Sequence, residues 1–237
     1  MSEKQLPKIN IIYEDNHLLV VEKPVNILMQ EDATEDIDML TILKDYLKHK
    51  YNKPGNVYLG LVHRLDRPVG GVCVFAKTSK AASRLSKQFQ GHSIEKYYLS
   101  IVENNLKPEG TLIDYLVKDG STNTVTTTTK DKGKKAILHY KSLVTTDNKN
   151  LILVKLETGR SHQIRVQFAS RNNPLLYDQR YNKNTNKGQI ALWSTRLVFD
   201  HPTTNERLVF NSIPPFINPW SLFDKETYKH ISKQSIN

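Results

Sequence analysis

Short apolar runs, and stretches in which apolar and polar residues alternate, recur along most of the chain, and they predict strands. The predicted strands cover residues 10–13, 17–23, 56–65, 72–76, 97–102, 136–144, 151–156, 196–199 and 207–210. The last two are separated by His-Pro-Thr-Thr-Asn and predict a hairpin. A loop is expected at residues 66–71, because a proline and two glycines follow one another there. Residues 104–135 are polar and predict a turn-rich insertion with some strand.

Helical spacing is confined to three segments. Leu40, Leu43 and Leu47 fall at i, i+3 and i+7, which predicts one buried helix face. A second helix is expected after Thr78 or Ser79 as N-cap, with Gly91 at its C-terminal end. Its apolar face would consist of Ala81, Ala82, Leu85 and Phe89. Residues 161–170 predict the third helix.

Many strands, few helices and no regular alternation of the two predict an α+β fold with a mostly antiparallel, mixed sheet and flanking helices. No composition change marks a boundary, so residues 1–237 are expected to form one domain. The single cysteine, Cys73, excludes a disulfide framework and a cysteine-based zinc site. The first ten residues do not resemble a signal peptide, and no apolar run is long enough for a membrane helix. A cytoplasmic protein with no membrane partner is therefore expected.

The net charge gives the first indication of a partner. The 34 Lys and Arg residues against 24 Asp and Glu residues give a net charge of +10. Such an excess favours a polyanion such as nucleic acid as the partner. The alternative is a basic enzyme of another class that its charge keeps in solution.

Two polar segments, residues 63–66 and 158–165, are flanked by apolar strands and are candidates for chemistry. Asp66 at the end of a strand is suited to a pocket, and an ionised carboxylate there needs a fixed cation, for which arginine is best. Arg160 and Arg165 lie five residues apart, so on a helix only one of them would meet Asp66. The alternative is that Asp66 only closes its turn.

The sequence contains no motif for several other kinds of catalytic or binding site. There is no glycine-rich phosphate loop and no serine in a nucleophile elbow. His63, His162 and His201 lack the spacing of metal ligands. Neither a metal nor a cofactor is expected.

The segment HRLDRPVGGVCVFAKTSKAASRL, residues 63–85, resembles the signature of the RluA-type RNA pseudouridine synthases. Four further segments resemble motifs of that family in the same order: YEDNHLLVVEKP (13–24), KYYLSIV (96–102), TGRSHQIRVQFA (158–169) and HPTTNERLVFNSIPP (201–215). Together they cover residues 10 to 215, and the chain is identified as a member with the pseudouridine synthase catalytic fold. It departs from the family where Thr-Ser-Gly is Val69-Gly70-Gly71, His-Leu is Gln167-Phe168 and Gly-Asp is Tyr177-Asp178. These departures concern the details of the substrate rather than the reaction.

The resemblance implies that uridine in RNA is isomerised to pseudouridine without a cofactor, a metal or a nucleotide. Asp66 would be the essential carboxylate, acting either by covalent addition to the sugar or by deprotonating the ribose. Arg165 would pair with Asp66. Tyr98 would stack on the flipped uracil and assist the loss of the proton from carbon 5, whereas Tyr97 would face the other side of the strand. Arg64 would replace the flipped base in the RNA stack, or alternatively contact a phosphate.

The remaining RNA-binding candidates surround these residues. His63 is expected mainly to position its loop, and the lysines near residue 133 form either a solvated loop or a grip on the RNA backbone. The full set of expected RNA-binding residues is His63, Arg64, Lys132, Lys134, Lys135, Arg160 and His162. The chain starts directly with the catalytic hairpin, so a separate N-terminal RNA-binding domain is not expected. The protein is therefore expected to be a monomer that recognises a tRNA or rRNA stem-loop with unpaired bases.

Two other functions remain open at this point. A catalytically silent RNA-binding or RNA-folding factor on the same scaffold would bind RNA without isomerising it. An unrelated hydrolase would combine Asp66 with His63 or His162 and show a bell-shaped pH profile.

Overall fold

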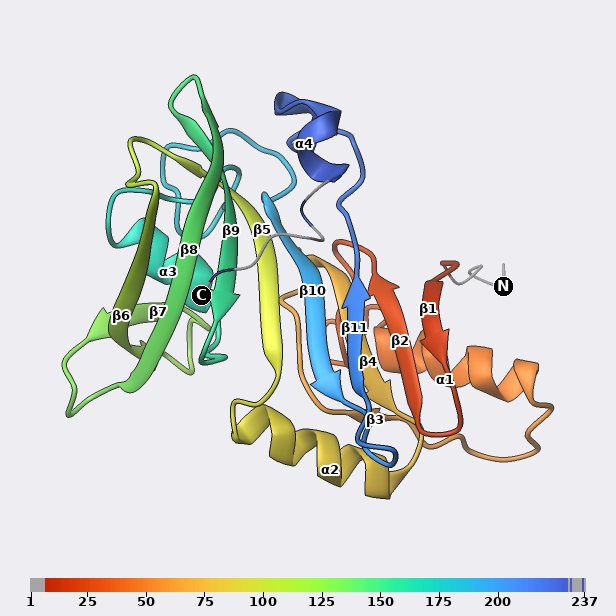
Figure 1. Ribbon diagram of the computed structural model, residues 1–237. Coiled ribbons are helices and arrows are strands. Elements are labelled where there is room, and N and C mark those ends of the chain that lie inside the picture. Colours follow the sequence, from red (N-terminus) through yellow and green to blue (C-terminus); the bar gives the residue numbers. More distant parts are fainter. Residues whose placement is uncertain (1–6, 230, 232–235, 237) are drawn as a thin grey trace. The chain divides into compact units, whose positions relative to one another are not determined.

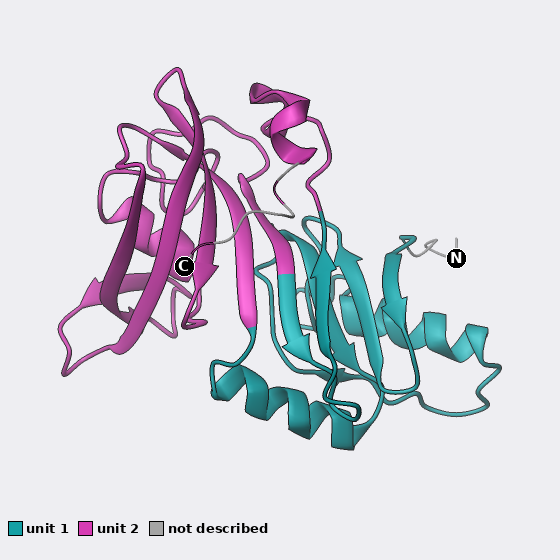
Figure 2. Cartoon of the chain, viewed as in Figure 1, with its two compact units in different colours: residues 1–94, 197–212 teal, residues 95–196, 213–237 magenta. Residues whose placement is uncertain are grey.

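The structure is a computed structural model that describes residues 7–229, 231 and 236 (Figure 1). Its contacts divide the chain into two compact units, coloured separately in Figure 2. Unit 1 holds residues up to Ile94 and Leu197–Ser212, and unit 2 holds Glu95–Arg196 and the residues from Ile213 onward. The chain therefore passes between the units three times. The expectation that residues 1–237 act as one catalytic domain stays a prediction.

The sheet of unit 1 is built on two buried strands. β2 (Leu18–Lys23) pairs antiparallel with β1 (Asn10–Glu14) on one side and β4 (Gly70–Ala76) on the other. All of β4 and almost all of β2 are buried, which explains why both strands consist mainly of consecutive apolar residues. The short β3 (Gly60–Leu61) also pairs with β4. β11 (Arg207–Asn211) pairs with β10 (Leu192–Asp200), which begins in unit 2 and ends in unit 1.

Two capped helices pack in unit 1. α1 (Met39–Lys50) begins where the Asp38 side chain accepts a hydrogen bond from the backbone N–H of Thr41. Its buried residues are Met39, Ile42, Leu43 and Leu47. Leu40 is only half-buried, so the predicted apolar face was rotated by a fraction of a turn. α2 (Ser79–Gln90) has Thr78 as its N-cap, as predicted, and packs Ala81 and Leu85 into a core with residues of β2 and β4.

Unit 2 contains a five-stranded antiparallel arrangement with the order β5-β9-β8-β6-β7. The strands are β5 (Glu95–Glu103), β6 (Glu109–Lys118), β7 (Val125–Thr128), β8 (Lys134–Thr146) and β9 (Lys149–Leu156). The long hairpin of β8 and β9 is drawn in green in Figure 1. The helical elements are α3 (Gln163–Ala169), η1 (Trp220–Leu222) and α4 (Lys225–Lys229).

Two sequence predictions about these elements were wrong, and a third was incomplete. The strand predicted over residues 56–65 is limited to Gly60–Leu61, because only these residues pair with β4. Gly70 and Gly71 belong to β4 rather than to the loop before it. The segment 104–135, predicted as a turn-rich insertion with some strand, contains all of β6 and β7 and the first two residues of β8. Its apolar residues Leu116 and Val125 are buried in a cluster with Ala136 and Val166, contacts that the local composition does not reveal.

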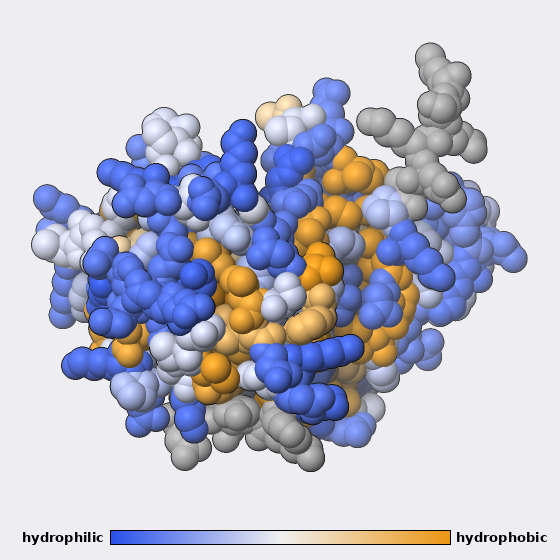
Figure 3. Space-filling view, turned by 90° about the horizontal axis from the view of Figure 1, so that it is seen from above, coloured by the Kyte–Doolittle hydropathy of each residue, from blue (hydrophilic) through white to orange (hydrophobic). Residues whose placement is uncertain are grey.

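Much of the surface is polar. Figure 3 shows one face on which hydrophilic residues predominate and hydrophobic residues are visible between them. Within the described part of the chain, no helix has the length and apolar character needed to cross a membrane.

Candidate active site

The loop that carries Asp66 lies between β3 and β4 in unit 1. The backbone N–H of Val69 donates to the carbonyl oxygen of Asp66 at 3.0 Å, which closes a turn around Pro68. The chain then enters β4 through Gly71, whose φ of 115° is a conformation that side-chain-bearing residues rarely adopt. Asp66 is half-buried at this turn. The backbone conformation at position 71 therefore favours glycine.

A buried lysine supports this turn. The Nζ of Lys23, at the end of β2, donates to the carbonyl oxygens of Pro24 (2.9 Å), Arg67 (3.0 Å) and Val69 (2.8 Å). Its side chain is fully buried, and burial lowers the pKa of Lys23 to about 8, while the charge of the Asp66 carboxylate acts in the opposite direction. Lys23 thus fixes the turn on both sides of Pro68. Sequence reasoning gave it no role, although a lysine that ends an apolar strand and precedes a proline was a visible signal.

The two residues before Leu65 behave differently from each other. Nε2 of His63 accepts a hydrogen bond from the backbone N–H of Val74 at 3.1 Å, and its ring stacks on Phe89 with centroids 4.8 Å apart. His63 therefore anchors the loop to β4 and α2, which is the positioning role expected of it. Arg64 is exposed. Residues 62–69 are not a strand, so strand alternation does not determine the relative directions of the Arg64 and Asp66 side chains.

Tyr97 and Tyr98 lie on opposite faces of β5 in unit 2. Tyr97 is buried, with the Lys155 ammonium 5.8 Å and the Arg196 guanidinium 5.1 Å from the centre of its ring. Tyr98 is half-buried on the other face. The alternation that excluded Tyr97 from a pocket agrees with this placement.

Arg165, on α3, forms a buried two-pronged ion pair with Asp178. Its Nε donates to Oδ2 at 2.8 Å, and one terminal nitrogen donates to Oδ1 at 2.7 Å. The Asp178 carboxylate also accepts hydrogen bonds from the backbone N–H groups of Arg180 and Tyr181. The guanidinium lies 5.1 Å from the centre of the Tyr181 ring. Asp178 therefore fixes the orientation of Arg165, a role that sequence reasoning did not assign.

The remaining predicted RNA-binding residues of unit 2 surround the loop before α3. Nε of Arg160 donates to the carbonyl oxygen of Lys135 at 2.9 Å, and its backbone N–H donates to the side chain of Gln163. His162 has a φ of 52°, and its Nδ1 lies 2.6 Å from the hydroxyl of Tyr181. Lys132, Lys134 and Lys135 are exposed at the start of β8 and in the turn before it. The structure thus brings Arg160 and Lys135 together.

The predicted residues are divided between the units: His63, Arg64 and Asp66 belong to unit 1, and the others belong to unit 2. The pairing of Asp66 with Arg165 therefore stays a prediction. Among the described residues, no cluster of histidine, cysteine or carboxylate side chains could hold a metal ion.

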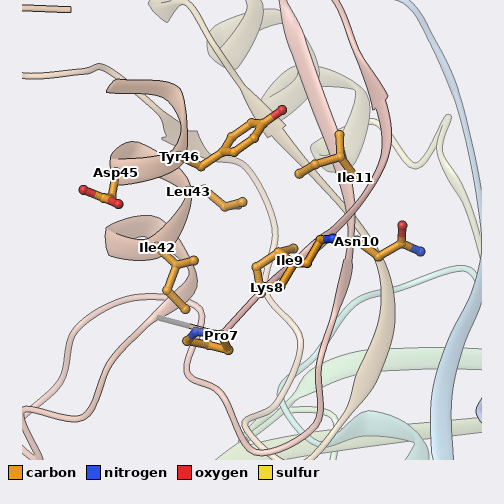
Figure 4. Close-up of a pocket in the computed structure, with 9 residues that line it drawn as sticks. All are labelled: Pro7, Lys8, Ile9, Asn10, Ile11, Ile42, Leu43, Asp45 and Tyr46. Atoms are coloured by element: carbon orange, nitrogen blue, oxygen red, sulfur yellow. The ribbon is translucent and has the colours of Figure 1, made fainter. Parts of the chain in front are cut away.

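A cleft of about 580 Å³ in unit 1 is not this site (Figure 4). It lies between β1 and α1 and is lined mainly by apolar side chains, among them Ile9, Ile11, Ile42 and Leu43. None of the predicted site residues lines it.

Comparison with known proteins agrees with the motifs and the fold. Residues 17–170 match the family described as RNA pseudouridylate synthase. The chain is 31% identical to the ribosomal large subunit pseudouridine synthase D of Zymomonas mobilis, over 90% of this chain and 72% of that protein. It is 33% identical to an uncharacterized RNA pseudouridine synthase of Aquifex aeolicus, over 87% of this chain and 70% of that one.

A solved structure extends the likeness to the fold. Human RNA pseudouridylate synthase domain containing 1 superposes with a TM-score of 0.75 at 18% identity, covering 99% of this chain and 98% of that chain. The fold is accordingly that of the pseudouridylate synthases. With its family match over residues 17–170 and its relatives above 30% identity, the chain belongs to the RNA pseudouridylate synthase family and is an RNA pseudouridine synthase, an isomerase.

Proposed function

We propose that this protein, as a monomer, converts a specific uridine in a structured ribosomal RNA stem-loop to pseudouridine, with Asp66 as the essential carboxylate. The observation that carries the proposal is the Asp66 turn. Lys23 and Gly71 fix its backbone, and His63 anchors the residues that precede it. Ribosomal RNA is favoured over transfer RNA because the Zymomonas mobilis relative is described as acting on the large ribosomal subunit.

In this proposal, Asp66 assists the cleavage of the bond from nitrogen 1 of uracil to the sugar. The base then rotates within the pocket and is joined again through carbon 5, so leaving group and incoming group are the same uracil. Arg165 keeps Asp66 ionised and directed at the ribose. Asp178 holds one edge of the Arg165 guanidinium, and we expect the opposite edge to face Asp66.

In this proposal, Tyr98 binds the extruded base and Arg64 fills the gap that the base leaves in the RNA stack. Tyr98 would stack on the extruded uracil and receive or relay the carbon 5 proton. Arg64, which is exposed beside the turn, would fill the vacated position in the RNA stack. His162, Arg160, Lys132, Lys134 and Lys135 would contact the RNA backbone.

The test is mapping of pseudouridine in total RNA from cells with the wild-type gene, without the gene, and with Asp66→Asn. We expect one or a few sites to be lost in the last two strains. Purified Asp66→Asn protein should bind the corresponding RNA within about tenfold of wild type, because phosphate contacts supply most of the affinity. Wild-type turnover by Asp66→Asn would overturn the assignment of Asp66.

The same experiment separates the other functions. A silent RNA-binding factor would leave every pseudouridine in place when the gene is removed. A hydrolase that uses Asp66 with His63 is disfavoured, because Nε2 of His63 is occupied by the backbone N–H of Val74. Free uracil or cleaved RNA among the products would reopen that possibility.

A further inference from the structure

Unit 2 contains a second buried lysine, which the proposed reaction does not use. Lys96, near the start of β5, is 8% exposed. It pairs in register with Leu156, the last residue of β9, so it lies beside the loop that begins at Glu157. Its Nζ is 3.7 Å from the point that a Cβ on Gly159 would occupy, which places the ammonium against the backbone of this loop.

Lys96 has no hydrogen-bond acceptor for its ammonium among the described residues. Among the residues that the structure describes, no oxygen accepts a hydrogen bond from its Nζ and no carboxylate forms an ion pair with it. Burial and, to a smaller extent, the positive charge of Arg160 together lower the pKa of Lys96 to about 8. Because buried charges are nearly always paired, an unpaired ammonium here indicates that its partner is a ligand.

Arg160 supplies a second cation at the same place. Its Nε is tied to the carbonyl oxygen of Lys135, and its backbone is tied to Gln163, so the guanidinium is held in position. Its terminal nitrogens bond to no other described residue. The loop at Gly159 is therefore flanked by an ammonium and a guanidinium edge, and neither is neutralised within the described chain.

The position of Tyr98 indicates where Lys96 and Arg160 would lie relative to the bound substrate. Residues 96 and 98 lie on the same face of β5, about 7 Å apart along the strand. If Tyr98 stacks on the extruded uracil, an anion held by Lys96 lies about one nucleotide away. An RNA phosphate is such an anion, because a point charge and a planar fork together match its oxygens.

We propose that Lys96 and Arg160 form a binding site for one backbone phosphate next to the target uridine. The inference rests on the proposed function, since it takes the RNA substrate and the place of Tyr98 from it. It assigns to Lys96 a task distinct from that of the exposed lysines on β8, which would contribute only diffuse attraction. The phosphate contact would hold the nucleotide while its base is extruded.

The experiment measures the affinity of wild type, Lys96→Met and Arg160→Gln for an RNA stem-loop that already carries the product, so that no turnover occurs. Each variant should bind about tenfold more weakly, and its logarithmic salt slope should be smaller by about 0.7–0.9, the signature of one lost phosphate contact. Lys141→Met is the matched control, because Lys141 is an exposed lysine on β8 of the same unit. It should bind within about twofold of wild type.

RNA with a single uncharged methylphosphonate linkage identifies the phosphate. One linkage beside the target position should weaken wild type about tenfold and leave Lys96→Met unchanged, because the contact is already absent in that variant. Equal weakening of both proteins at every linkage would overturn the proposal. So would wild-type affinity and salt slope in Lys96→Met.

Inorganic phosphate gives a readout that does not depend on activity. Millimolar phosphate should raise the melting temperature of wild type and of Lys141→Met but not of Lys96→Met. Failure of the proposed function would appear as absence of pseudouridine in wild type. Failure of the phosphate site would appear as identical phosphate responses of wild type and Lys96→Met.

Discussion

Two buried lysines, one in each unit, have nearly the same pKa but opposite surroundings. Burial lowers the pKa of both Lys23 and Lys96 to about 8. The Nζ of Lys23 donates three hydrogen bonds to carbonyl oxygens of its own unit, whereas the Nζ of Lys96 bonds to no described oxygen. A lysine ammonium has three donors, so Lys23 is saturated and Lys96 is not.

This difference separates a structural cation from a binding cation. The bonds of Lys23 join β2 to the Asp66 turn and leave no donor for a ligand. Lys96 is held in a place where its charge is unfavourable until an anion arrives. The arginines of unit 2 show the same contrast. Asp178 forms a two-pronged ion pair with Arg165, whereas among the described residues the Arg160 guanidinium donates only to the carbonyl oxygen of Lys135.

Replacing Lys23 should have the largest effect. In Lys23→Met three carbonyl oxygens lose their donor, and we expect a loss of about 3 kcal/mol in the free energy of unfolding. Urea unfolding followed by circular dichroism measures it. The same change at Lys96 should increase the free energy of unfolding at neutral pH, because it removes a buried charge. If Lys96→Met were as destabilising as Lys23→Met, the contrast between the two lysines would be wrong.

Conservative replacements of Arg165 and Arg160 should have different effects on the rate of isomerisation. Arg165→Lys exchanges a planar fork for a point charge, so Asp178 would no longer fix the direction of the cation. Single-turnover rates should fall at least about 100-fold, as for other preorganised electrostatic groups. Arg160→Lys should weaken RNA binding while the rate at saturating enzyme stays within a few-fold of wild type. The reverse order would show that Arg160, and not Arg165, serves Asp66.

The buried charge of Lys96 should make the stability of the protein depend on pH. An unfolded lysine has a pKa of about 10.5. Between about pH 8 and pH 10.5 the unfolded state therefore binds more protons than the folded state, and the Lys96 contribution to stability rises with pH. Relative to wild type, Lys96→Met should be more stable below pH 8, by up to about 3 kcal/mol for a pKa lowered from 10.5 to about 8. Denaturant titrations should show this advantage shrinking toward pH 10.5, and a constant difference would contradict the assignment.

Arg64 should show the smallest effect, and only on some substrates. If its side chain replaces the extruded base, Arg64→Ala should slow single-turnover isomerisation about tenfold on a stem-loop, where stacking opposes extrusion. On a flexible single strand with the same uridine, the loss should be about twofold. Similar weakening of binding on both RNAs, with the rate restored at saturating enzyme, would instead identify Arg64 as a phosphate contact.

Much of the site was accessible from the sequence because its motifs are local. Thr78 as a helix cap and the opposite faces of Tyr97 and Tyr98 follow from the order of neighbouring residues. What failed depended on distant partners. Residues 56–65 have strand composition, but β4 pairs with only two of them. Leu116 and Val125 looked like parts of a polar insertion until their packing against Val166 placed them in a core.

The sequence alone determined the α+β class, the family and the residues that resemble its catalytic set, because ordered motifs and the period of two residues in strands are properties of the chain. The tertiary structure decided what surrounds each charged side chain. Two of the three carbonyl oxygens that accept from Lys23 are 44 and 46 residues away, and Asp178, 13 residues beyond Arg165, orients that arginine. No local pattern encodes such partners, since hydrogen bonding and burial depend on which segments meet in space. For the same reason, only the fold distinguishes Lys96 from the other lysines of the chain.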